Sequence, residues 1–131
     1  MNGYWGKHLI LNACCCDRNM INDKDNIIKF IKELCQITDM KRIGDVIFYE
    51  VEKSPENDKD DLTGLTAFQM IKTSNITIHF CVPSASLYLD FFSCKDYNEE
   101  EVKFLIKDYF NPHVMEYKVI LRDANKKIKI S

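Results

Sequence analysis

Residues 64–94 read GLTAFQMIKTSNITIHFCVPSASLYLDFFSC, and this stretch decides the fold. Three runs rich in branched and aromatic side chains predict strands at about 65–73, 76–81 and 86–93. The middle run alternates between apolar and more polar side chains, as a strand does when one face packs on a core. Pro83 and Ser84 supply a turn after it. We therefore expect consecutive antiparallel strands here.

Outside this stretch, the sequence predicts two helices and three further strands. Asn22 or Asp23 can cap a helix that runs to about Ile37 and repeats apolar side chains at helical spacing. Asn98 can cap a second helix, which carries glutamates in its first turn and ends before Pro112. The other strands are expected at 7–13, 45–52 and 113–121. A polar loop and a loose tail are expected at 53–61 and 126–131.

The order of these elements indicates the fold class. A strand and a helix are followed by four strands, a helix and a last strand. Amphipathic helices are the natural cover for one face of such a sheet. The expected fold is therefore α+β, a two-layer α/β sandwich in which a mainly antiparallel sheet carries two helices on one face. With 131 residues the chain has the size of one domain, expected to span residues 1–131.

Composition excludes several classes of function. The net charge of -2 argues against nucleic acid as a partner, because phosphate binding needs dense positive charge. Neither a signal peptide nor a membrane span is visible, so no membrane association and a cytoplasmic location are expected. The six cysteines are then expected to be reduced, and no Cys-x-x-Cys pair indicates a metal site. The run at 14–16 is most simply interpreted as a packed strand end.

Three stretches resemble the bacterial and archaeal S-adenosylmethionine decarboxylases, which are pyruvoyl-dependent enzymes made as proenzymes. The first is GKHL at 6–9 followed by Cys16-Asp17, similar to the family's G-[RK]-H-L and C-D. The second is GLTA at 64–67 leading into TSNITIH at 73–79, where the family has G-V-S-G and E-S-H-[IL]-[ST]-I-H. The third is DFFSC at 90–94, similar to D-[VL]-F-T-C. The ungapped block from 64 to 94 is the most specific part.

The resemblance implies that the chain cuts itself between Thr73 and Ser74. The Ser74 hydroxyl would attack the Thr73 carbonyl, and elimination from the resulting ester would turn Ser74 into a pyruvoyl cofactor. By position, Thr66 would offer a hydroxyl to the developing oxyanion and His79 would be the base that removes the Ser74 Cα proton. Cys94 matches the cysteine that returns a proton to the product.

The same resemblance implies the reaction and the partner. The pyruvoyl ketone would form a Schiff base with a small amino-acid substrate and act as an electron sink for decarboxylation, in polyamine and spermidine biosynthesis. Family members of this size form homodimers with active sites at the interface, so both copies can line each pocket. Apolar side chains expected to suit such an interface are Tyr4, Trp5 and Tyr88. His8 is then a strand histidine near the dimer surface.

The strand pattern predicts where the site residues lie. If the last turn is centred on Ser84, antiparallel pairing places Ser74 opposite Cys94 and His79 opposite Leu89. His79, however, is five residues from Ser74 and so falls on the opposite face of a regular strand. A bulge near Asn75 would be needed to bring the two side chains together.

Departures from the family pattern leave three hypotheses. Thr73 replaces a glutamate and Asn75 a histidine beside the cleavage serine, while the nucleoside-binding aromatic, glutamate and tryptophan are replaced by Val51, Pro83 and Cys81. The first hypothesis is an S-adenosylmethionine decarboxylase with a divergent pocket. The second is a pyruvoyl-dependent decarboxylase of ornithine or arginine. The third is an unprocessed, inactive homologue that acts as a binding or regulatory subunit, in which Ser74, His79 and Cys94 are ordinary strand residues.

Overall fold

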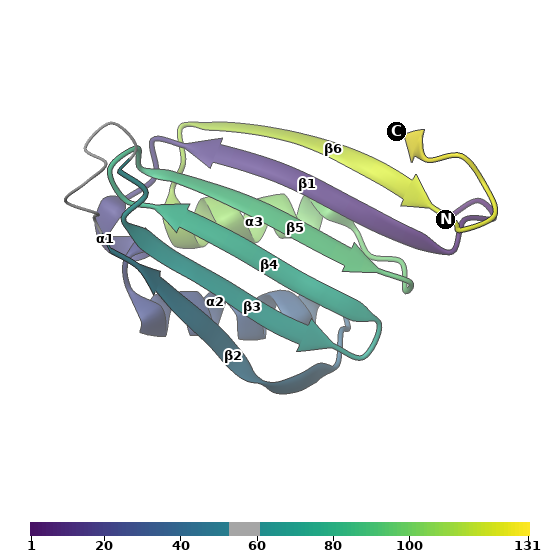
Figure 1. The fold of residues 1–131 in the computed structure, drawn as a ribbon, viewed down its shortest axis with the longest axis horizontal. Helices are drawn as coiled ribbons and strands as arrows, with labels where there is room; N and C mark the ends of the chain where they lie inside the picture. The colour runs from purple at the N-terminus through teal and green to yellow at the C-terminus, as the bar shows by residue number, and fades with distance from the viewer. Residues whose placement is uncertain (53–60) are drawn as a thin grey trace.

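The computed structural model describes residues 1–52 and 61–131, and within them a seven-stranded sheet carries the helices on one face (Figure 1). Every strand pair is antiparallel, and the order across the sheet is β2-β3-β4-β5-β1-β6-β7. The elements are β1 Gly6–Cys14, α1 Arg18–Ile21, α2 Lys24–Ile37, β2 Arg42–Val51, β3 Gly64–Ile71, β4 Ser74–Cys81, β5 Ser86–Ser93, α3 Glu99–Phe110, β6 Val114–Arg122 and β7 Lys129–Ile130.

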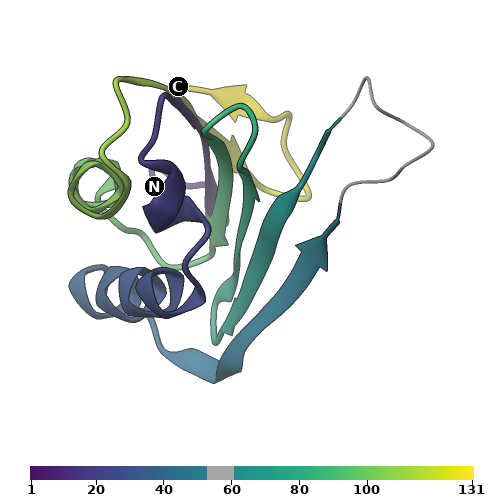
Figure 2. The same ribbon diagram turned by 90° about the vertical axis from the view of Figure 1, so that its left-hand side faces the viewer.

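The helices and the sheet form two layers, which confirms the predicted α+β sandwich. Figure 2 shows α2 and α3 side by side against the same side of the sheet. Between the layers, the Phe110 ring of α3 lies 4.9 Å from that of Phe30 in α2 and 5.2 Å from that of Phe80 in β4, measured between centroids. All three side chains are fully buried. This aromatic contact joins both helices to the centre of the sheet.

The two long helices begin where capping residues satisfy their first backbone N–H groups. The Asp23 carboxylate accepts hydrogen bonds from the N–H groups of Asp25 and Asn26, so Asp23 rather than Asn22 is the cap of α2. Asn98 accepts from the N–H of Glu100 at the start of α3. Asn111 ends α3 in the left-handed conformation, with φ 46°.

Two features differ from the predicted elements. Residues 126–131 are not a loose tail, because β7 pairs with β6 and the Ser131 N–H donates to the Val119 carbonyl at 2.8 Å. The short helix α1 was not predicted; Asp17 caps it by accepting from the N–H groups of Asn19 and Met20. Of the loop predicted at 53–61, residues 53–60 lie outside the described part of the chain.

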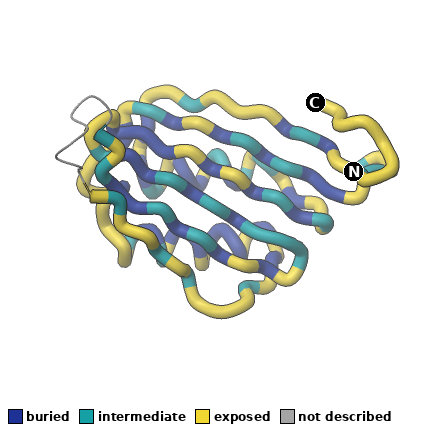
Figure 3. Tube along the Cα trace, viewed as in Figure 1, coloured by how far each residue is buried: buried dark blue, intermediate teal, exposed yellow. Residues whose placement is uncertain are grey.

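The face of the sheet opposite the helices carries an unusual number of exposed apolar side chains. Along the central strands β1, β3, β4 and β5, buried residues alternate with more exposed ones, as the colours of Figure 3 show. Tyr49 is 71% exposed, Ile47 63% and Met70 50%, and all three lie on strands β2 and β3. We call this the open face. None of the described helices is long and apolar enough to span a membrane.

Candidate active site

The hairpin formed by β3 and β4 carries most of the predicted site residues. Its strands pair in regular register from Gly64 opposite Cys81 to Ile71 opposite Ser74. The next turn, residues 82–85, closes with a hydrogen bond from the Ala85 N–H to the Val82 carbonyl. Because this turn has an even number of residues, β4 and β5 pair one residue away from the predicted register.

The register shift corrects the predicted neighbours. Ser74 lies opposite Ser93, not Cys94, and His79 lies opposite Tyr88, not Leu89. Cys94 is the first residue after β5, and its backbone contacts Thr73. Cys94 and the peptide bond predicted to be cut are therefore at the same end of the hairpin, although the pairing is different. We call Thr73, Ser74, Ser93 and Cys94 the cleavage end.

Ser74 has a strained backbone. Its φ of 150° belongs to a region that is populated almost only by glycine. The Ser74 Oγ accepts a hydrogen bond of 3.1 Å from the amide of Asn75, whose side chain is also 3.4 Å from the Thr77 hydroxyl on the open face. The Asn75 side chain thus links the Ser74 hydroxyl to the open face.

Thr73, the residue before the predicted cleavage point, is held at two points. The Cys94 N–H donates to the Thr73 carbonyl oxygen at 3.0 Å, and the Thr73 hydroxyl shares a 2.8 Å hydrogen bond with the fully buried Ser93 hydroxyl. Ser93 also accepts from the N–H of Lys95. An N–H aimed at a carbonyl oxygen stabilises the negative charge that develops when that carbonyl is attacked. Sequence reasoning missed this donor because it is a backbone group.

Thr66 and His79 form a second cluster on the open face. The Thr66 hydroxyl and the His79 Nδ1 share a hydrogen bond of 2.8 Å, and the two residues face each other across β3 and β4. The Tyr88 ring stacks beside the imidazole with centroids 6.5 Å apart. These contacts fix the orientation of the imidazole. We call Thr66 and His79 the histidine pair.

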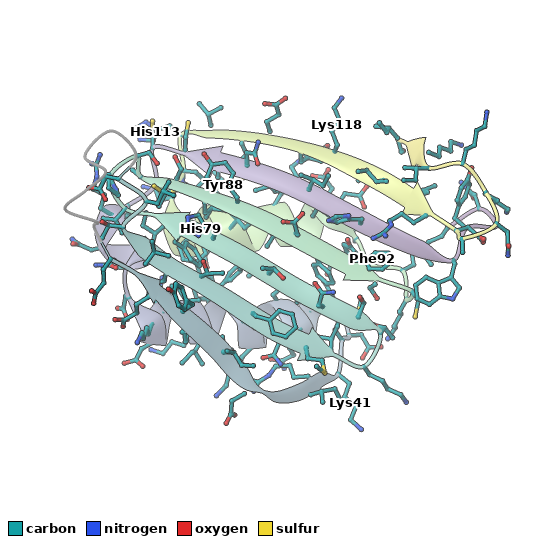
Figure 4. All side chains as sticks on the ribbon, in the orientation of Figure 1. Lys41, His79, Tyr88, Phe92, His113 and Lys118 are labelled. Atoms are coloured by element: carbon teal, nitrogen blue, oxygen red, sulfur yellow. The ribbon has the colours of Figure 1, made fainter. Side chains whose placement is uncertain are left out.

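Within one chain the histidine pair does not reach the cleavage end. Strand β4 pairs without a register shift on both sides from residue 74 to residue 81, so the bulge predicted near Asn75 is absent. Five residues of regular strand separate Ser74 from His79 by about 17 Å. Figure 4 shows the same separation, with His79 and Tyr88 toward one end of the sheet and Phe92, the neighbour of Ser93, toward the other. Thr66 bonds His79 and is equally remote from the Thr73 carbonyl.

A buried lysine fixes the segment that carries Cys94. Lys7 of β1 donates to Asp96 at 3.1 Å, to Glu99 at 2.7 Å and to the Tyr97 carbonyl. Burial acts to raise the pKa of both carboxyl groups, but the hydrogen bonds and charge of Lys7 outweigh it and hold each pKa below its ordinary value. Tyr97 adds a hydrogen bond from its hydroxyl to the Phe91 carbonyl. The connection between β5 and α3 is therefore held to the beginning of β1.

The positions where the family's nucleoside-binding side chains are replaced lie together near the histidine pair. Val51, Gly64 and Cys81 form one row across β2, β3 and β4, and Pro83 is in the turn after Cys81. Gly64 is required in this row, since a Cβ there would lie 1.9 Å from the Phe80 carbonyl oxygen. The replacements at Val51, Cys81 and Pro83 are thus concentrated in one place, whereas those at Thr73 and Asn75 flank Ser74 at the cleavage end.

The cysteines of the predicted strand end differ from one another. Cys16 is buried, and burial raises its pKa to about 11, which keeps the thiol protonated at neutral pH. Cys15 is exposed and has a left-handed backbone, with φ 58°, so only part of the run is packed. No cluster of three or more side chains suited to a metal ion occurs within residues 1–52 and 61–131.

Comparisons with known proteins give a consistent result. A family model described as S-adenosylmethionine decarboxylase matches residues 7–123. Two proteins named S-adenosylmethionine decarboxylase proenzyme, from the Langeland and Okra strains of Clostridium botulinum, are each 25% identical over 120 residues, 91% of this chain and 95% of theirs. The fold is similar to the crystal structure of the adenosylmethionine decarboxylase from Aquifex aeolicus VF5, with a TM-score of 0.75, 18% identity and 95% of each chain covered.

Proposed function

Because the chain belongs to the S-adenosylmethionine decarboxylase family, we propose that it is a self-processing, pyruvoyl-dependent decarboxylase cut between Thr73 and Ser74. One observation carries this proposal. A hydroxyl-bearing residue with a strained backbone directly follows a carbonyl that accepts a hydrogen bond from the Cys94 N–H. These residues fit the origin of a pyruvoyl group, since they supply a nucleophile, its target and a donor for the oxyanion.

Strain at Ser74 favours the cut. A residue held in a glycine-like conformation stores about 1–3 kcal/mol, and this energy is released when its peptide bond is broken. In the first step the Ser74 Oγ forms a bond to the Thr73 carbonyl carbon, the peptide C–N bond breaks, and the nitrogen takes up the proton. The Cys94 N–H stabilises the oxyanion that forms on the way.

The second step needs a base that one chain does not bring to Ser74. The proposal therefore includes a homodimer in which the histidine pair of one copy faces the cleavage end of the other. The open face suits this role, because it carries the histidine pair together with the exposed side chains of Ile47, Tyr49 and Met70. Two sheets packed face to face and related by a two-fold axis can bring opposite ends together.

Once formed, a pyruvoyl group supplies an electron sink for loss of a carboxylate from an amino-acid substrate. Cys94 lies after β5 beside Thr73, where its thiol can return a proton to the product. The leading substrate is S-adenosylmethionine, which places the enzyme in polyamine biosynthesis. The substitutions near the histidine pair favour a second candidate, a smaller amine such as ornithine or arginine, because they remove groups that would hold a nucleoside.

The intact mass of the purified, denatured protein tests self-processing. We expect two fragments divided between Thr73 and Ser74, with the second about 17 Da lighter than a fragment beginning in serine, because the serine nitrogen is lost as ammonia. A single species of 15.4 kDa would instead support the inactive binding subunit. Carbon dioxide release from S-adenosylmethionine, ornithine and arginine would then identify the substrate.

Co-expression of two inactive variants tests the shared site. Neither Ser74→Ala nor His79→Ala should be cut when produced alone. In mixed dimers, the intact His79 of the Ser74→Ala copy faces the intact Ser74 of the other copy, so up to about half of the His79→Ala chains should be cut. Absence of fragments from the mixture, with both variants folded, would contradict the shared site.

A further inference from the structure

A small cavity borders the residue whose carboxylate self-cleavage would release. Its volume is about 250 Å³, and its lining residues are Asp39, Met40, Lys41, Lys72, Thr73 and Lys95. Three connections meet there: the one before β2, the turn between β3 and β4, and the one after β5. Figure 4 shows Lys41 at this end of the sheet. We call it the lysine pocket.

The lysine pocket is positively charged. Lys95 donates to the Asp39 carboxylate at 2.5 Å and to its carbonyl at 2.7 Å, and this contact holds the pKa of Asp39 below its ordinary value. The single carboxylate of the pocket is therefore already paired. Lys41 and Lys72 are exposed and form no ion pair with any carboxylate in the described residues. Their two charges are available to an anion.

The position of Thr73 connects this charge to the chemistry. The Lys72 N–H donates to the Lys41 carbonyl at 2.9 Å, so the backbones of the two lysines are held next to each other. Thr73 follows Lys72 directly and is fixed by its bonds to Ser93 and Cys94. A carboxylate formed at Thr73 would thus stay at the pocket.

We propose that the lysine pocket receives the carboxylate that leaves when Ser74 is converted, and that it accelerates this step. The inference rests on the proposed self-processing. In the elimination a base takes the Ser74 Cα proton, the Cα–Cβ double bond forms, and the Cβ–Oγ bond breaks. The electron pair of that bond goes to the Thr73 carboxylate, so negative charge grows beside Lys41 and Lys72. Nearby cations lower the energy of such a transition state.

The test compares two double variants that lose the same charge. Lys41→Gln/Lys72→Gln removes the free cations of the pocket, and Lys29→Gln/Lys32→Gln removes two exposed cations from α2 as a control. Each protein is made by cell-free translation, and cutting is followed by intact mass with and without hydroxylamine. Hydroxylamine cleaves an ester and leaves serine at the new terminus, so it reveals the intermediate before elimination.

We expect Lys41→Gln/Lys72→Gln to lose the ester about fivefold more slowly than the wild type and the control, as the loss of exposed charges near the leaving group implies. High salt should slow the wild type and leave this variant unchanged. If the wild type is cut and the pocket variant matches the control without accumulating ester, the pocket has no such role. If the wild type is never cut, the proposed function fails and this inference fails with it.

Discussion

The cleavage end and the histidine pair share strand β4, yet the fold holds them differently. At the cleavage end, Thr73 is held by the Cys94 N–H and by the Ser93 hydroxyl. The ion pairs of Lys7, which we call the Lys7 clamp, fix the segment that follows Cys94. The histidine pair depends on one hydrogen bond between two side chains on the open face. The difference teaches that a single chain holds the Thr73–Ser74 peptide firmly but does not bring His79 to it, which is why the proposed function assigns the base to a second copy.

The largest effect should come from removing the nucleophile at the cleavage end. Ser74→Ala and Ser74→Gly should both slow cutting by at least about a thousandfold, because neither has a hydroxyl. The glycine variant should nevertheless be more stable than the alanine variant by about 1 kcal/mol, since glycine tolerates the observed φ. Thermal denaturation measures the difference. Equal stability of the two variants would show that residue 74 is not strained.

Removing the Thr66 hydroxyl from the histidine pair should slow cutting without abolishing it. Thr66→Val removes the hydroxyl that orients the His79 ring while keeping the shape of the side chain. We expect the elimination step to slow by about tenfold and its pH profile to change, and Thr66→Ser to restore both. Mass spectrometry with hydroxylamine follows the ester. An unchanged elimination rate in Thr66→Val would show that the Thr66 hydroxyl has no role in this step.

The clamp at the cleavage end predicts a pH-dependent loss of stability. Lys7→Met leaves Glu99 without its cation and Asp96 with only the N-terminal amine of Met1, 3.8 Å away, and should cost about 2 kcal/mol at neutral pH. Because the folded pKa of each carboxyl is lowered, the stabilisation exists above their ordinary pKa values and is lost as the pH falls through the folded ones. The gap to the wild type should therefore shrink in acid. Lys118→Met, on the exposed side of β6, serves as the control in urea denaturation.

The smallest expected effect is a faster elimination step, caused by a substitution in the lysine pocket. Asp39→Asn removes the carboxylate paired with Lys95 and leaves a third free cation in the lysine pocket. Elimination should become about twofold faster at low salt and return to the wild-type rate at high salt. A time course of intact mass at two ionic strengths measures it. A slower reaction would contradict the idea that positive charge drives this step.

The sequence predicted the fold well because its signals are local. The alternation from Ile76 to Cys81, the Asn98 cap and the end of α3 before Pro112 each depend on neighbours in the chain. The pairing of β6 with β7 was missed because Lys129 and Ile130 form a strand only through a partner that precedes them in the sequence. Helix α1 was missed because one turn leaves too short a pattern.

The candidate site was predicted less completely, for a geometric reason. Motif spacing identified Ser74, His79 and Cys94, but their neighbours depend on whether the turn after β4 contains an odd or even number of residues. Ala85, the last residue of that turn, has a left-handed backbone with φ 52°, and no signal in the sequence indicates this conformation. The N–H of Cys94 carries no side-chain signal at all. The strand register of β4 and β5 therefore decides which groups contact Thr73, and the types of residue in the motifs do not reveal that register.

The place of the proposed scissile bond in the sheet has a consequence for the two fragments that a cut would produce. A cut in the turn between β3 and β4 assigns β1, β2 and β3 to one fragment and the later strands to the other. In the sheet, however, β1 is inserted between β5 and β6. Strands of the two fragments therefore alternate within one sheet, and neither fragment can dissociate without breaking the strand pairing of the other.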